Sequence, residues 1–459
     1  GAERGTRTNP FSSLQDALAF AQSEERRTVV VAGGTNELSS PLVIERAVSI
    51  RGGFDAESWK PGAATTTLRA DDGFSQDAMI RVRAEEVRIE DMVFDASGPE
   101  AAVDQRGGSL TVGEVKSTGA LRVSGNGTLA LEVSEIRGVR RGASPAISAT
   151  DSQLEITDSE IEVPVESASD APSGRATAVG LLGAEGRIQG STLSGNSETD
   201  IAVLLRVDSS RVTLSDSRLE LAGGSGAVGI RAVGSTVRAL GNRVSGGEAA
   251  RFIHGVSLRN SGGSFVNNLF EGNDGEDASS VVTARLVGSD TQWLHNTIFL
   301  DAQRGNGYNI AGDSRTLSVN NLLASARTDI DGAAIYVDRR GGVTSVGSCY
   351  AGWNAVLTMP SDDSRWTNAR RTELFRNAEQ LRNAPGSFFA NAVVQEAAEE
   401  AGATTDAAQI DCGDIAVSRD QLSSEYGISV SGELWPELPE SGAGRVPGAL
   451  RTSESDAQE

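Results

Sequence analysis

Arginines recur at one position of a repeated segment, and they are the residues that could bind an anionic ligand. That position holds Arg206, Arg231, Ser257 and Arg285 in chain order, and Arg259 follows Ser257 by two residues. A guanidinium group binds a carboxylate or a sulfate through two parallel hydrogen bonds. If these side chains point outward from one face, that face could bind an acidic polysaccharide. The alternative is an ordinary solvated face, because arginine is abundant in this chain.

Catalysis on such a polymer would require further groups. Elimination needs a base beside a Ca²⁺ ion held by several carboxylate oxygens, and hydrolysis needs carboxyl groups that share the acid and base roles. The candidates for an elimination site are Arg206, Arg231 and Arg285 with Asp208. We predict no catalytic site, and the alternative is a polysaccharide lyase or hydrolase with a non-standard site on this face.

The chain has two histidines, and they do not share a position of the repeat. His254 alternates with the apolar residues Val256 and Leu258, so we expect it to face the core, whereas His295 should face outward. A metal site built on a histidine pair is therefore not expected. The acidic segment 273–277 could hold Ca²⁺, but its spacing matches no EF-hand loop. We predict a solvated acidic loop, no metal site and no cofactor.

A short sequence motif recurs along the chain, and the structure it forms must position all these residues. The motif consists of apolar residues at alternate positions, then a serine or an asparagine, then another apolar residue. The serines and asparagines recur at intervals of 25 to 32 residues and are Ser159, Ser191, Ser217, Asn242, Asn268, Asn296 and Asn321. Alternation with a period of two is typical of β-strands, and serine and asparagine suit the corner between two strands. A third apolar segment lies about 13 residues before each corner, so each repeat contains three strands.

Three short strands per repeat of roughly 25 residues predict a parallel β-helix. Equivalent strands then stack about 4.8 Å apart, so the corners line up in one column. This column resembles the asparagine ladder of right-handed parallel β-helices of the pectin-lyase-like superfamily. The segments 9–19, 29–35 and 48–55 are similar to the first coils of secreted bacterial proteins built on that fold.

The resemblance covers about residues 8–355 and implies an all-β chain with a single right-handed parallel β-helix of about 11 or 12 coils. The superfamily includes lyases, hydrolases, adhesins and structural stalks, so the fold does not fix the activity. The Gly-His-Gly and Arg-Ile-Lys phrases of its hydrolases are absent. We therefore predict an extracellular or cell-surface β-helix scaffold, adhesin or passive binding protein.

The same patterns divide the chain into four segments. Apolar residues at helical spacing between residues 14 and 21 predict an amphipathic helix that caps the N-terminal end of the solenoid. After residue 437 Pro, Gly, Ser and acidic residues dominate without periodicity. The predicted segments are an N-terminal cap at 1–28, the parallel β-helix at 29–355, an irregular C-terminal cap at 356–436, and an acidic tail or linker at 437–459.

The two cysteines, Cys349 and Cys412, are too few for a zinc site and match no CxxC motif. Cys349 follows the corner residue Ser348, so its side chain should point away from the core. A disulfide to Cys412 would tie the C-terminal segment to the last coil, and two free thiols are the alternative. A disulfide persists only in an oxidising compartment, which agrees with secretion.

The composition narrows the possible partners. The 459 residues carry 41 Lys and Arg against 63 Asp and Glu, a net charge of −22 at pH 7. Because this charge repels phosphate backbones, nucleic acid is not an expected partner. No apolar run approaches the 18 or more residues that a membrane-spanning helix needs. An acidic polysaccharide or another surface protein is the expected partner.

Overall fold

The computed structural model is all-β, a parallel β-solenoid of about 11 turns, which confirms the fold class that the repeat predicts. The described residues are 5–62, 64–96, 98–140, 145–166, 175–196, 201–247, 249, 251–273, 280–327, 330–338, 340–360, 372–384, 387–395, 410, 412 and 416–435. They fall into two compact units, Gly1–Val212 and Thr213–Glu459. The tail predicted at 437–459 lies outside the described residues. Among the described helices, none has the length and apolarity to cross a membrane.

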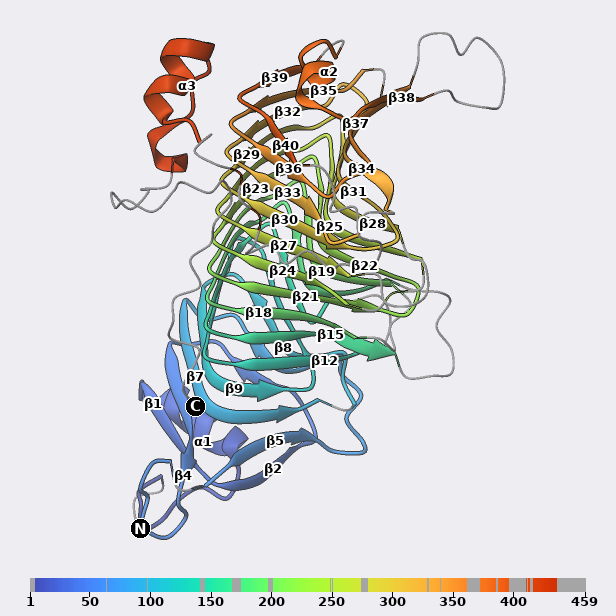
Figure 1. Cartoon of the computed structure of the whole chain (residues 1–459). Helices are drawn as coiled ribbons and strands as arrows, with labels where there is room; N and C mark the ends of the chain where they lie inside the picture. The colour runs from blue at the N-terminus through green and yellow to red at the C-terminus, as the bar shows by residue number, and fades with distance from the viewer. Residues whose placement is uncertain are drawn as a thin grey trace. The chain divides into compact units, whose positions relative to one another are not determined.

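A typical turn contributes two strands to one sheet, here called sheet 1, and one strand to another, here called sheet 2 (Figure 1). In the first unit, sheet 1 contains β1 (Thr28–Ala32), β2 (Gly34–Leu38), β4 (Val48–Phe54), β5 (Thr66–Ala70), β7 (Glu86–Asp95), β9 (Ser109–Ser117), β11 (Thr128–Glu132), β12 (Glu135–Arg140), β14 (Gln153–Thr157), β15 (Glu160–Glu166), β17 (Glu185–Gln189) and β18 (Thr192–Asn196). Sheet 2 of this unit contains β3 (Leu42–Ile44), β6 (Ala78–Val82), β8 (Ala101–Arg106), β10 (Ala120–Ser124), β13 (Ile147–Thr150), β16 (Arg175–Leu182) and β19 (Ile201–Asp208). Strand β20 (Arg211–Ser215) spans the boundary between the two units.

The second unit repeats the same plan. Its sheet 1 contains β21 (Arg218–Gly223), β23 (Thr236–Leu240), β24 (Arg243–Gly246), β26 (Gly262–Val266), β27 (Leu269–Asn273), β29 (Asp290–Leu294), β30 (Thr297–Asp301), β32 (Arg315–Val319), β33 (Leu322–Ser325), β35 (Gly342–Val346), β36 (Cys349–Ala351), β39 (Phe388–Ala390) and β40 (Val393–Gln395). Its sheet 2 contains β22 (Gly226–Val233), β25 (Phe252–Arg259), β28 (Ser280–Val287), β31 (Arg304–Ala311), β34 (Asp331–Val337), β37 (Ala355–Pro360) and β38 (Thr372–Phe375). Helices α2 (Ala378–Arg382) and α3 (Arg419–Tyr426) and a 3₁₀ turn (Gly432–Leu434) complete it.

The expected N-terminal helix is α1 (Leu14–Ser23). The Ser13 side chain caps it by accepting a hydrogen bond from the Asp16 N–H at 3.2 Å. Leu14, Leu18 and Ala21 form its buried face beside β1. The helix therefore buries apolar residues at the first turn, as the spacing predicts.

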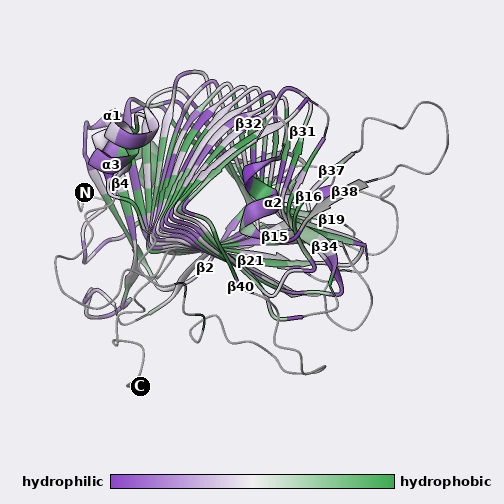
Figure 2. Cartoon of the chain, turned by 45° about the horizontal axis from the view of Figure 1, so that its top comes forward, coloured by the Kyte–Doolittle hydropathy of each residue, from purple (hydrophilic) through white to green (hydrophobic). Residues whose placement is uncertain are grey.

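Alternate side chains of each strand fill the core, and hydrophobic and hydrophilic positions alternate along the strands (Figure 2). In β29, for example, Thr291 and Trp293 are buried while Asp290 is exposed. Trp293 stacks on Phe265 of the preceding turn with ring centroids 4.1 Å apart. Trp293 therefore points inward, and the aromatic rings stack along the solenoid axis of this unit.

The corner asparagines of the second unit bond from one turn to the next. Asn268 Oδ1 accepts hydrogen bonds from both the N–H and the Nδ2 of Asn242, each at 2.9 Å. Asn296 accepts from Asn268 in the same way, and Asn321 accepts from Asn296. In this unit Ser217 joins the ladder by donating its N–H to Asn242. Each buried backbone donor at this corner thus has a partner.

At other corners, serine hydroxyls accept hydrogen bonds from the backbone N–H groups of the preceding turn. In the first unit the N–H of Ser134 donates to Ser159 Oγ and that of Ser159 donates to Ser191 Oγ. A second ladder, which was not predicted, lies at another corner of the second unit and is formed by Ser235, Ser261, Ser289 and Ser314. Its serines recur at the same period as the asparagines, and that recurrence could have identified them.

The strands of sheet 2 in the second unit bend at one glycine position. The pairing of β22 with β25 runs from Val228↔His254 to Ile230↔Val256 and skips Gly229 and Gly255. A Cβ on Gly229 would lie 2.5 Å from the carbonyl oxygen of Gly255, so this close approach requires glycine. The alternation of inward and outward side chains shifts at Gly255, because Gly255 and Val256 are both buried.

The C-terminal residues 416–435, here called the strap, pack on the outward face of sheet 1 in the second unit. Val417, Leu422 and Val430 of the strap bury the outward residues Leu294 and Val319. The Val417 backbone also exchanges two hydrogen bonds with the Asn320 side chain, at 2.8 and 2.9 Å. The strap thereby covers one row of sheet 1 across several turns.

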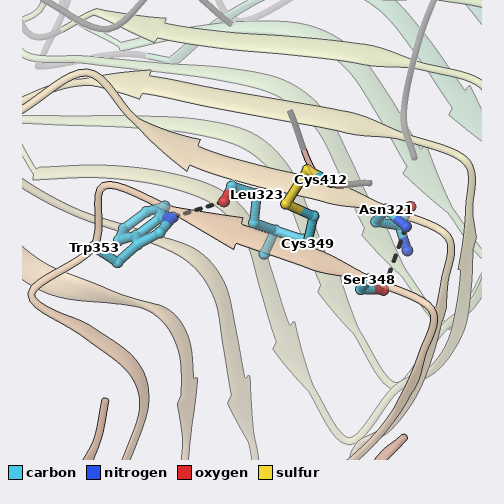
Figure 3. The surroundings of a disulfide bond; sticks show 6 residues. All are labelled: Asn321, Leu323, Ser348, Cys349, Trp353 and Cys412. Atoms are coloured by element: carbon cyan, nitrogen blue, oxygen red, sulfur yellow. Dashed lines mark hydrogen bonds between the residues drawn. A yellow bond between two sulfur atoms is a disulfide. The ribbon is translucent and has the colours of Figure 1, made fainter. Parts of the chain in front are cut away.

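A disulfide joins Cys349 to Cys412, as the sequence predicts. Cys349 is on β36 and points outward, where it packs with Leu322, Ile410 and Cys412. Figure 3 shows the bond beside β33 and Trp353, whose Nε1 donates to the Leu323 carbonyl oxygen at 3.0 Å. The bond fixes the segment around residue 412 to the last turns of the solenoid.

His295 lies beneath the strap and makes the protein sensitive to acid. It is 5% exposed, its ring packs edge-on against Trp435, and burial lowers its pKa to about 4. The unfolded chain gains the proton near pH 6.5 and the folded protein only near pH 4. Stability is therefore fully present above pH 6.5 and falls between those values, by about 3 kcal/mol in total.

A His295→Asn variant should lose less unfolding free energy than the wild type between pH 7 and pH 4. Asparagine fits the site, because Asn267 and Asn320 adopt the same left-handed conformation (φ 58° and 53°) as His295 (φ 55°). Urea denaturation at several pH values measures the difference, and protonation of carboxylates cancels in the comparison. Parallel stability curves for the two proteins would show that His295 does not contribute.

Candidate ligand-binding face

Two of the arginines from the repeat lie in one row on the outward face of sheet 2 in the second unit. Arg231, Ser257 and Arg285 pair in register on the consecutive strands β22, β25 and β28. Asn309 on β31 and Tyr336 on β34 continue the row. None of the five side chains belongs to the buried core. Since neighbouring strands lie about 4.8 Å apart, the row is a regularly spaced line of polar groups.

Two guanidinium groups on this face have no acidic partner among the residues that the structure describes. Arg285 is exposed, and so is Arg259, which lies two residues beyond Ser257. Within the part of the chain that the structure describes, no carboxylate oxygen lies within 4.0 Å of either group. Both can therefore bind an external anion without first breaking an ion pair.

The first unit differs, because several of its sheet 2 arginines are already paired. Arg206 Nε lies 2.6 Å from Asp208 Oδ2. Arg81 pairs with an aspartate at 2.7 Å and Arg122 with a glutamate at 3.0 Å. The candidates Arg206 and Asp208 thus neutralise each other, whereas Arg231 and Arg285 belong to the row in the second unit.

His254 faces outward beside this row, so the expectation that it faces the core is wrong. Its ring lies 4.9 Å from that of Phe252, and the inward position between them is Ile253. The bend at Gly255 causes the difference, because it shifts the alternation on which the expectation rested. His254 and Arg285 are on adjacent strands and interact electrostatically.

The environment of His254 keeps its imidazole neutral. Partial burial, and then the positive charge of Arg285, lower the pKa of His254 to about 4. At neutral pH the ring therefore carries one N–H and one free lone pair. The face thus combines guanidinium, amide, phenol and neutral imidazole groups, which can bind a carboxylate and the hydroxyls around it.

The described residues contain no group of three or more His, Cys, Asp or Glu side chains placed to hold a metal ion. Most of the acidic segment 273–277, considered above for Ca²⁺, lies outside the described residues.

Sequence reasoning missed three members of this face, namely His254, Asn309 and Tyr336. Asn309 and Tyr336 follow Arg285 at the period of the repeat. Extending the arginine column by two more turns would have found them. His254 could not be found in this way, because its orientation depends on the bend at Gly255.

No protein-family model and no curated protein sequence matches the chain. Among solved structures, the Dettilon tailspike protein matches with a TM-score of 0.40 and 11% identity over 75% of this chain and 64% of its own. The A-module of the mannuronan C-5 epimerase AlgE6 of Azotobacter vinelandii matches with a TM-score of 0.35 and 14% identity over 83% and 94%. The catalytic domain of a GH87 alpha-1,3-glucanase matches with a TM-score of 0.36 and 13% identity over 82% of this chain and 66% of its own. The chain thus spans less than two thirds of the tailspike and glucanase chains.

Proposed function

We propose that this protein is an extracellular β-solenoid that binds an acidic polysaccharide on the outward face of sheet 2 in its second unit, without catalysing a reaction. The supporting observation is the pair of exposed guanidinium groups, Arg259 and Arg285, which have no carboxylate partner among the described residues. They stand on a face that also presents Asn309 and Tyr336. A uronate polymer offers carboxylates that the two arginines can bind and hydroxyls that Asn309 and Tyr336 can bind.

The cysteine pair supports a location outside the cytoplasm. A disulfide such as Cys349–Cys412 forms and persists in an oxidising environment. Adhesion or passive binding at a cell surface would need a stable body and a charged face, both of which a solenoid provides. Another surface protein with an acidic patch is the alternative partner for the same arginines.

Replacing Arg285 should weaken the binding of oligogalacturonate roughly tenfold or more. A hydrogen bond between charged groups contributes about 1.5–3 kcal/mol, and 1.4 kcal/mol corresponds to a factor of ten in affinity. Isothermal titration of Arg285→Gln against the wild type measures this. Binding should also weaken as salt is raised, because contacts between exposed charges are screened.

The matched control is Arg243→Gln, which removes the same charge from sheet 1 of the same unit. Arg243 pairs with Glu271 at 2.8 Å and does not lie on the proposed face. Its affinity for oligogalacturonate should equal that of the wild type. Equal losses in both variants, or affinity that does not depend on salt, would count against the proposed face.

The position of His254 next to Arg285 favours a second candidate function, β-elimination on a uronate chain. Neutral His254 would remove the proton beside the carboxylate, Arg285 would stabilise the resulting charge, and the bond to the departing sugar oxygen would break as the double bond forms. The departing oxygen would take up a proton. The test is the ultraviolet absorbance of an unsaturated uronate product. Its appearance with the wild type and its loss in His254→Asn would support β-elimination and contradict passive binding.

A further inference from the structure

A separate groove of about 910 Å³ lies on the outward side of sheet 1 in the second unit. Its floor is formed by β26, β29, β32 and β35, three of which Figure 1 labels one above another. Phe388 of β39 and Ile428, next to α3, form parts of its wall. None of the sheet 2 residues discussed above contributes to it.

Two polar atoms in this groove lack a hydrogen-bond partner within the described protein. They are Gln292 Oε1 and Ser387 Oγ, and both atoms are buried. A buried acceptor without a partner costs about 1–3 kcal/mol. Gln292 Oε1 can only accept, so it requires a donor such as a hydroxyl group.

Cationic and apolar groups surround these two atoms, together with one exposed carboxylate, that of Asp290. Arg315 is exposed, and no carboxylate oxygen of the described residues lies within 4.0 Å of it. Arg340 has only a distant contact with the exposed Asp313, at 3.9 Å. Phe388 is 48% exposed and presents a flat apolar surface. The groove therefore offers an acceptor for hydroxyls, cations for an anion, and a ring that a carbohydrate can stack on.

We infer that this groove binds an anionic pyranose, such as one uronate unit of an oligosaccharide. After a rotation of the Gln292 side chain that exposes Oε1, a sugar hydroxyl would donate to this atom. The carboxylate would contact Arg315, and the C–H face would pack on Phe388. A neutral sugar would satisfy the first and third contacts but not the second. The inference is independent of the sheet 2 face, because it rests on different residues of a different sheet.

The test is isothermal titration with trigalacturonate and with the neutral maltotriose. Arg315→Gln should weaken trigalacturonate binding at the groove at least fivefold and leave maltotriose binding unchanged, whereas Phe388→Ala should weaken both. Both side chains are exposed, so both variants should fold, and thermal melting verifies this. Arg243→Gln is again the matched control and should bind like the wild type.

The other outcomes distinguish the groove from the sheet 2 face or overturn the inference. Trigalacturonate binding that is lost in Arg285→Gln but unaffected by Arg315→Gln and Phe388→Ala would overturn the groove and support the sheet 2 face. Loss in Arg315→Gln and Phe388→Ala with normal binding in Arg285→Gln would support the groove alone. Failure of both sugars to bind, or equal binding of both that is insensitive to Arg315→Gln, would overturn the assignment of an anionic pyranose.

Discussion

A Cys412→Ala variant should lose up to about 4 kcal/mol of unfolding free energy, because the disulfide closes a loop between residues 63 positions apart. Cross-linking a loop of this length reduces the entropy of the unfolded chain by roughly that amount. Cys412 also contributes to a buried apolar cluster with Ile410 and Leu322, which loosens when the bond is absent. Chemical denaturation of the oxidised protein and the variant measures the loss.

Cys349→Ala is the matched partner of this variant. If the cross-link is the source of the stability, each single variant and the double variant should lose nearly the same amount, because either change removes the whole bond. Additive losses would instead assign the effect to packing of the two side chains. Two reactive thiols per chain in the denatured, unreduced protein would show that the bond does not form.

The second large effect is expected for Asn268→Leu, which should cost about 3 kcal/mol or more. Asn268 Oδ1 accepts from the N–H and Nδ2 of Asn242, and its Nδ2 donates to the carbonyl oxygen of Ala239 at 3.0 Å. Leucine leaves these buried groups unpaired, and each unpaired group costs about 1–3 kcal/mol. The measurement is denaturant unfolding together with hydrogen exchange at the Asn242 amide, which should lose its protection.

Asn268→Ser provides the control, because serine occupies the equivalent position in the same column. At that position Ser348 Oγ accepts the Asn321 N–H at 3.3 Å. Serine at 268 should therefore retain part of the ladder and cost clearly less than leucine. An equal cost for both variants would mean that side-chain volume, and not the hydrogen bond, determines stability at this corner.

The repeat predicted the solenoid because its information is local. Each turn places Asn242, Asn268 and Asn296 at one corner, and parallel pairing of equivalent strands then brings them together. The disulfide could be predicted for a similar reason, since Cys349 follows a corner and must face outward. Features that recur with the period of the repeat are therefore accessible from the sequence.

Features that break the period of the repeat could not be predicted from the sequence. The orientation of His254 depends on the bend at Gly255, where the alternation of inward and outward side chains shifts. The strap binds through contacts such as Val417 with Asn320, which are 97 residues apart and leave no periodic mark in the sequence. The groove beside Phe388 depends on such long-range packing as well, so no column of residues revealed it.

The disulfide also determines how the chain would carry mechanical load. In a molecule stretched by its two ends, tension reaching Cys349 passes through the sulfur–sulfur bond to Cys412 and bypasses the residues between them. That enclosed loop contains β37 to β40 and helix α2. Fully extended, it would add roughly 200 Å to the contour length, at about 3.4 Å per residue. The last turns of the solenoid are thus shielded from a pulling force while the bond is intact, and reduction would release this length.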